Sequence, residues 1–262
     1  MTIIQITLIS VSIQILVLAL LLTLSVKLIS ESERNLTAVF MSFYYALWLL
    51  TDLYWLVYDL MRPDMRMPFA ANEIGEAAMF LMGAATINSA VKHRTRLPMG
   101  YLAGIHLFAI SNVVLWILWS GEIVQDIIVG TVIIWFFYSI VRAHRWSQAF
   151  CGREWIVLAV LCTALIISQG LTFIVPEDAR DIPDLCAYII MIAGIVFFAY
   201  AFFRAYREKL PYAQLFLSFA LNIWITVSKY MSGGNWYNLF LTLETIGFPL
   251  WYITVRKVVK SE

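Results

Sequence analysis

Long apolar runs separated by short polar breaks make up most of the chain. A membrane-spanning helix needs about 20 largely apolar residues, and these runs reach that length. The breaks between them carry Pro, Gly or charged side chains, which are typical of helix ends. The pattern predicts nine helical segments, at about 3–26, 37–61, 70–91, 98–119, 122–142, 154–175, 184–204, 211–231 and 236–255.

Composition strengthens this prediction. The chain has 262 residues, of which 62% are hydrophobic and 13% are charged, whereas a soluble domain is about 45–50% apolar and about 25% charged. We therefore expect an all-α, polytopic integral membrane protein with one transmembrane domain, 1–262, in a lipid bilayer. The expected location is a plasma membrane of bacterial type. No basic residue precedes Lys27, so the first run is expected to be retained rather than cleaved as a signal peptide.

The basic residues gather in alternate loops and thereby predict an orientation. They follow the segments at 70–91, 122–142, 184–204 and 236–255. Because cytoplasmic loops are rich in Lys and Arg, the N-terminus is predicted outside and the C-terminus inside, which agrees with an odd number of spans. The net charge of +1 gives no reason to expect a nucleic-acid partner.

Carboxylates inside the apolar segments are the main pointer to function. A charged side chain at the bilayer centre costs roughly 3 kcal/mol on insertion scales, so such acids are expected to face a protein interior or a wet cavity. The predicted orientation puts six of the seven in the outer half of the membrane and the last near its middle. They are Asp52, Asp59, Glu73, Glu76, Glu122, Asp126 and Glu244.

The second segment alternates aromatic and acidic residues on one helical face. Trp48, Asp52, Trp55 and Asp59 follow the spacing i, i+4, i+7, i+11. Carboxylates attract a cation by Coulomb forces, and tryptophan faces add cation–π energy. This stripe is therefore suited to an organic cation.

Two further pairs put carboxylates on shared faces. Glu73 and Glu76 are three residues apart, and Glu122 and Asp126 are four apart. The bland interpretation of Glu73 and Glu122 is that they are solvated acids at the positive end of a helix dipole. Without a nearby histidine, the Glu73–Glu76 spacing is too little to predict a metal site.

The predicted binding site is a cavity lined by four deep acids with an aromatic wall and an acidic rim. A structural role, as polar contacts between helices, is the competing interpretation. Lys229 is the one nearby cation. It is expected to be a snorkelling residue or one paired with Glu244 or an acid of the third segment, and the alternative is a ligand contact. The deep acids are Asp52, Glu76, Asp126 and Glu244, the wall is Trp48 and Trp55, and the rim is Asp59 and Glu73.

The function predicted from these residues is transport of a small cationic or amine-bearing solute, with exchange of a proton as one means of coupling. The alternative is a membrane-embedded sensor that signals to a cytoplasmic protein partner. A third hypothesis is an intramembrane hydrolase acting on lipid, which leaves enzyme activity uncertain. The chain has no HExxH, GxSxG or P-loop motif, and it names no cofactor.

Overall fold

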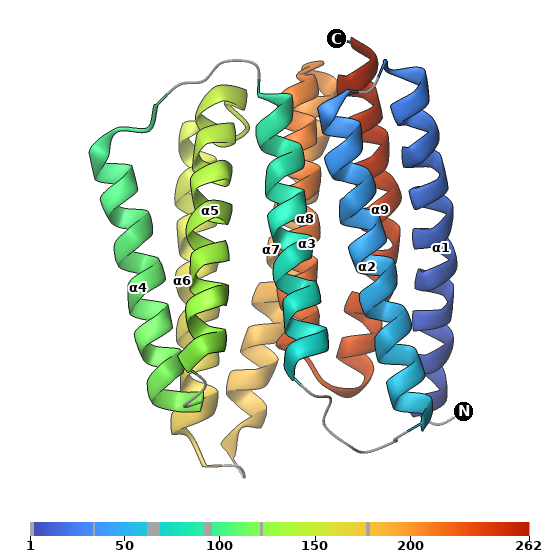
Figure 1. Cartoon of the computed structure of the whole chain (residues 1–262). Coiled ribbons are helices and arrows are strands. Elements are labelled where there is room, and N and C mark those ends of the chain that lie inside the picture. Colours follow the sequence, from blue (N-terminus) through green and yellow to red (C-terminus); the bar gives the residue numbers. More distant parts are fainter. Residues whose placement is uncertain are drawn as a thin grey trace. The chain divides into compact units, whose positions relative to one another are not determined.

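The computed structural model describes residues 3–33, 35–61, 69–91, 96–120, 123–176 and 179–261. These residues form α-helices, which confirms the all-α prediction (Figure 1). In chain order the helices are α1 (Ile3–Glu31), α2 (Leu36–Met61), α3 (Phe69–Ala90), α4 (Met99–Ser120), α5 (Ile123–Ser147), α6 (Gly152–Ile174), α7 (Asp181–Arg207), α8 (Pro211–Tyr230) and α9 (Gly234–Ser261).

Each helix coincides with one of the predicted apolar runs, and the differences lie at the ends. α5 continues to Ser147 and carries His144 and Arg145 in its last turn. α9 continues to Ser261 and carries Lys260 there. Basic side chains favour the negative end of the helix dipole, so these helices extend past their apolar residues. α8 begins at Pro211, whose fixed φ suits the first helical position.

Three of the described helices are long and apolar enough to cross a membrane. They are α1 from Gln5 onward, α2 and α7. Large apolar side chains are also exposed on the surface, among them Leu16, Ile166 and Val196, each at least 62% exposed. A surface of this kind is one that lipid or a partner normally covers.

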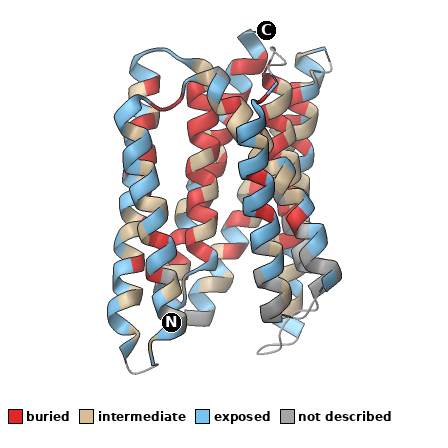
Figure 2. Ribbon diagram, turned by 90° about the vertical axis from the view of Figure 1, so that its left-hand side faces the viewer, coloured by how far each residue is buried: buried red, intermediate tan, exposed pale blue. Residues whose placement is uncertain are grey.

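The chain divides into two compact units. Unit 1 comprises Met1–Gln14 and Ser147–Thr254, and unit 2 comprises Ile15–Trp146 and Val255–Glu262. In unit 1, α7 packs against both α6 and α8, and in unit 2 α2 packs against α3. α1 and α9 contribute residues to both units. Along individual helices, buried positions alternate with exposed ones (Figure 2).

Close backbone approach joins α7 to α8 inside unit 1. A Cβ atom at Gly194 would overlap the ring of Trp224. The Trp224 indole Nε1 donates a hydrogen bond of 2.8 Å to the carbonyl of Met191, one turn earlier on α7. The absence of a side chain at Gly194 therefore lets a large aromatic ring lie directly against the neighbouring helix.

Candidate functional site

Glu244 of α9 is completely buried and holds three hydrogen-bond donors. Its Oε2 atom accepts from Lys229 Nζ at 2.7 Å and from Gln14 Nε2 at 3.2 Å. Its Oε1 atom accepts from the hydroxyl of Thr226 at 2.6 Å. A buried carboxylate is costly unless it is both paired and hydrogen-bonded, and Glu244 meets both conditions.

Lys229 supplies the compensating charge from the last turn of α8. Its side chain is only 5% exposed, so the pair with Glu244 is shielded at both ends. The ammonium also lies 4.8 Å from the ring centroid of Tyr230, at cation–π distance. The structure thus pairs Lys229 with Glu244, one of its predicted partners, and the buried ammonium does not reach the surface as a snorkelling side chain would.

Gln14 connects the network to α1, and its two hydrogen bonds fix the orientation of its own side-chain amide. The Gln14 amide nitrogen donates to Glu244, while its carbonyl oxygen accepts from the hydroxyl of Thr245 at 2.8 Å. The two bonds together assign the amide orientation, because only this orientation satisfies both neighbours. Gln14, Glu244 and Thr245 all belong to unit 1. We call the set Gln14, Thr226, Lys229, Glu244 and Thr245 the Glu244 network.

A buried polar stripe along α8 leads to the Glu244 network. Its members are three or four residues apart and share one helical face. Gln214 donates to the carbonyl of Ala205 at 3.0 Å. Ser218 shares a 2.8 Å hydrogen bond with the hydroxyl of Thr254. With a rise of about 1.5 Å per residue, the stripe from Gln214 to Lys229 is about 22 Å long. The stripe residues are Gln214, Ser218, Asn222, Thr226 and Lys229, all buried.

Asn222, the middle residue of the stripe, binds the backbone of α9. Its Nδ2 atom donates to the carbonyl of Gly247 at 3.1 Å. A Cβ atom at Gly247 would overlap the Asn222 Oδ1 atom, so the two helices approach each other only because this residue is glycine. Pro249 follows two residues later inside α9 and lacks the N–H of a regular helix. The stripe therefore meets α9 two residues before its internal proline.

Of the predicted site residues on α2, those that the structure describes lie in unit 2. Trp48 is buried and its ring meets that of Tyr44 edge-on, with centroids 6.4 Å apart. Asp52, Trp55 and Asp59 are half-buried. Trp48 is therefore the most buried of the four residues of the predicted stripe.

The remaining predicted acids, Glu73, Glu76, Glu122 and Asp126, have side chains outside the described part of the structure. Convergence of the four deep acids in one cavity stays a prediction. What the structure brings together is Glu244 with Lys229, Thr226 and Gln14. Among the described residues, no group of three or more His, Cys, Asp or Glu side chains could hold a metal ion.

Sequence reasoning missed most of the Glu244 network. The signal that could have found it is the run of polar residues at 214, 218, 222 and 226, spaced as one face of a helix. None of these four residues was among the predicted site residues. Gln14 has no local signal, because its partners lie about 230 residues away in the chain.

No family of known proteins, no curated protein and no solved structure matches this chain. It is an all-helical protein with at least three helices of membrane-spanning length and composition. Inside one of its units lies a buried carboxylate–ammonium pair at the end of a polar stripe.

Proposed function

We propose that the protein is a multi-pass integral membrane protein that binds and transports a small cationic or amine-bearing solute. One observation carries the proposal. Glu244 holds a primary ammonium, that of Lys229, inside an apolar helical unit. The hydroxyl of Thr226 and the amide of Gln14 complete its surroundings. Both groups donate to the carboxylate, and a hydrogen-bonded carboxylate is the counter-ion that an alkylammonium ion needs away from water.

In this proposal Lys229 occupies the solute's place when the site is empty. A carboxylate left unpaired in such an environment would be strongly destabilising. The tethered ammonium keeps Glu244 neutralised until an amine solute displaces it. The Lys229 side chain is long and flexible, and the neighbouring ring of Tyr230 offers the displaced ammonium a cation–π contact. If displaced Lys229 instead loses its proton, each solute bound releases one proton, which couples transport to pH.

The acids of the other helices have a supporting role in the proposal. Asp59 and Glu73 form the acidic rim that attracts cations electrostatically. The further cation contacts are Asp52, Glu76, Asp126, Trp48 and Trp55.

The proposed topology has nine spans, with the N-terminus outside and the C-terminus inside, and two contacts support the parallel course of α1 and α9 that an odd number of spans requires. In unit 2, Lys260 near the end of α9 lies 3.0 Å from Glu31 at the end of α1. In unit 1, the hydroxyl of Thr7 near the start of α1 donates to Asn238 near the start of α9 at 2.9 Å. The start of α1 thus contacts the start of α9, and the end of α1 contacts the end of α9. Two helices that cross the membrane in the same direction require this.

Uptake into proteoliposomes tests the proposed function. The purified full-length protein is reconstituted, and a panel of radiolabelled primary amines, quaternary amines and neutral analogues of equal size is offered. We expect saturable accumulation of at least one primary amine, and loss of that accumulation in the double variant Glu244→Gln with Lys229→Met, which leaves no unpaired charge. Unchanged uptake by the double variant would contradict the proposal. Binding without accumulation would favour the sensor.

A further inference from the structure

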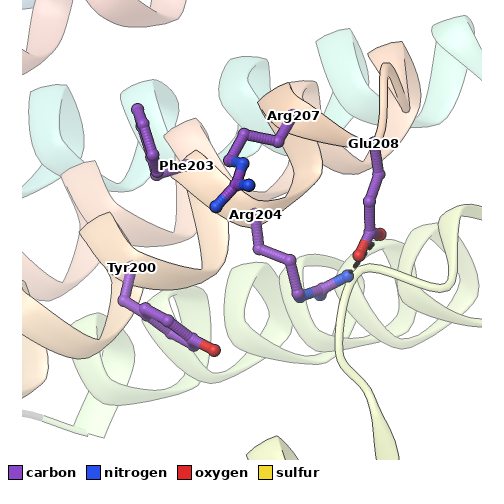
Figure 3. A pocket seen from close by; sticks show the side chains of 5 residues that line it. All are labelled: Tyr200, Phe203, Arg204, Arg207 and Glu208. Carbon is purple, nitrogen blue, oxygen red and sulfur yellow. Dashed lines mark hydrogen bonds and ion pairs between the residues drawn. The ribbon is translucent and has the colours of Figure 1, made fainter.

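A cavity of about 360 Å³ lies against the C-terminal turns of α7, apart from the Glu244 network. Its lining residues are spaced i, i+3, i+4, i+7, i+8 and therefore share one helical face. Figure 3 shows these side chains around the last turns of the helix, with the Arg204 guanidinium and the Glu208 carboxylate turned toward each other. The lining residues are Tyr200, Phe203, Arg204, Arg207 and Glu208.

Arg204 is a fixed part of the cavity wall. Its guanidinium binds both carboxylate oxygens of Glu154 on α6, at 2.8 and 2.9 Å. It also donates to Oε2 of Glu208 at 2.9 Å and to the carbonyl of Ala149 at 2.6 Å. All three of its nitrogens are thus engaged. Arg204 positions Glu208 and is not open to a ligand.

Arg207 and Glu208 are the two groups that a ligand can reach. Arg207 is exposed and has no hydrogen bond or ion pair within the part of the chain that the structure describes. The Glu208 side chain is 49% exposed and uses only Oε2 for Arg204. Its Oε1 atom remains open to a donor. Arg207 and Glu208 line the same cavity, and a guanidinium and an open carboxylate oxygen in one cavity match a ligand that carries a phosphate and a protonated amine.

Exposed aromatic side chains lie next to Arg207 and Glu208, on the preceding turns of α7. Tyr200 and Phe203 are 62% and 60% exposed and lie one to two turns before Arg207. With a rise of about 1.5 Å per residue, the order aromatic rings, guanidinium, carboxylate extends over about 12 Å of helix. A phospholipid presents acyl chains, phosphate and headgroup amine in the same order, and α7 is one of the helices able to span a membrane.

We propose that this cavity binds the phosphoethanolamine headgroup of a membrane phospholipid. Arg207 binds the phosphate, Glu208 Oε1 accepts from the primary ammonium, and the acyl chains run along Tyr200 and Phe203. The negative end of the α7 dipole also favours an ammonium at Glu208. A glycerol headgroup lacks the cation that Glu208 requires. A choline headgroup has no N–H to donate.

Native mass spectrometry of the full-length protein in detergent tests this proposal. Phosphatidylethanolamine, phosphatidylglycerol and phosphatidylcholine with identical chains are titrated separately. We expect the wild type to bind the ethanolamine lipid most tightly. Arg207→Gln should weaken that binding about fivefold, as expected for one interfacial charge. Glu208→Gln should remove the preference over phosphatidylglycerol. Lys209→Gln removes a neighbouring exposed charge and is the matched control, which should bind like the wild type.

Three results would overturn the proposal. The first is equal affinity of the wild type for all three lipids. The second is a loss in Lys209→Gln as large as that in Arg207→Gln, which would indicate general attraction by surface charge. The third concerns glycerophosphoethanolamine, which has the same headgroup without acyl chains. If it competes as well as the lipid does, the cavity recognises a free solute rather than a membrane lipid.

Discussion

The Nζ atom of Lys229 lies 2.7 Å from Oε2 of Glu244, and both side chains are withdrawn from solvent. The two residues are 15 positions apart on consecutive helices, so the ion pair joins the end of α8 to the middle of α9. Because unit 1 is largely apolar, removing one partner of this pair has a larger effect on stability than breaking a surface ion pair would have.

Charge pairing predicts a non-additive effect of mutation. Lys229→Met alone leaves Glu244 buried without its counter-ion and should destabilise the protein by about 3–5 kcal/mol. Glu244→Gln alone should do the same to Lys229. The double variant removes both charges and should recover most of that loss. Denaturant unfolding in detergent micelles measures all three free energies, and strictly additive losses would contradict the pairing.

The contact between Asn222 and Gly247 predicts a steric effect. Gly247→Ala places a methyl group against Asn222 and should cost about 1–3 kcal/mol of stability, as overpacking does. Adding Asn222→Ala makes room for the methyl group and should return part of the loss. Gly104→Ala on α4 is the control, because nothing lies within 4 Å of the added carbon. Thermal unfolding of these variants measures the difference, and equal effects of the two glycine changes would contradict the close approach.

Arg204 and Arg207 are predicted to differ in their tolerance of lysine. Arg204→Lys loses the two-pronged contact with Glu154 and the bond to Ala149, because an ammonium cannot reproduce the planar guanidinium. We expect a loss of about 1.5–3 kcal/mol, the usual value for a hydrogen bond to a charged group. Arg207→Lys should leave the stability near that of the wild type. Melting temperatures of the two variants check this, and a larger loss for Arg207→Lys would be inconsistent with the described contacts.

The proposed topology predicts opposite accessibility for the two ends of α8. Cys151, Cys162 and Cys186 are first replaced by serine, and Lys209→Cys and Gly233→Cys are then introduced separately. Both positions are exposed beyond the helix ends. A membrane-impermeant maleimide added to intact cells should label Gly233→Cys, and Lys209→Cys only after the cells are opened. The reverse pattern would invert the orientation, and labelling of both in intact cells would exclude a crossing by α8.

The helices could be predicted from the sequence because a long apolar run favours one local structure, the α-helix. The breaks at Pro211 and at residues 232–235 separated α7, α8 and α9 correctly. The C-terminal ends of α5 and α9 could not be predicted closely. Their last turns carry basic residues, so the apolar run stops before the helix does. Lys229 was named as a partner of Glu244 only as one of two alternatives, since sequence does not give the facing of neighbouring helices.

The polar stripe of α8 could have been predicted and was not. Ser218 and Thr226 are small and nearly neutral in hydropathy, so they do not interrupt an apolar run. Only their spacing with Gln214 and Asn222 reveals a shared face. The role of Gln14 could not have been predicted, because its contacts depend on which helices of unit 1 lie together.

The central claim is that Glu244 is a binding site for a primary ammonium, and chemical rescue of Lys229→Met tests it most directly. The variant leaves the carboxylate without its tethered amine. Millimolar methylammonium should raise its melting temperature, whereas tetramethylammonium, which has no N–H, and sodium should not. The double variant Glu244→Gln with Lys229→Met should not respond. Failure of methylammonium to stabilise Lys229→Met, or equal stabilisation of the double variant, would contradict the account.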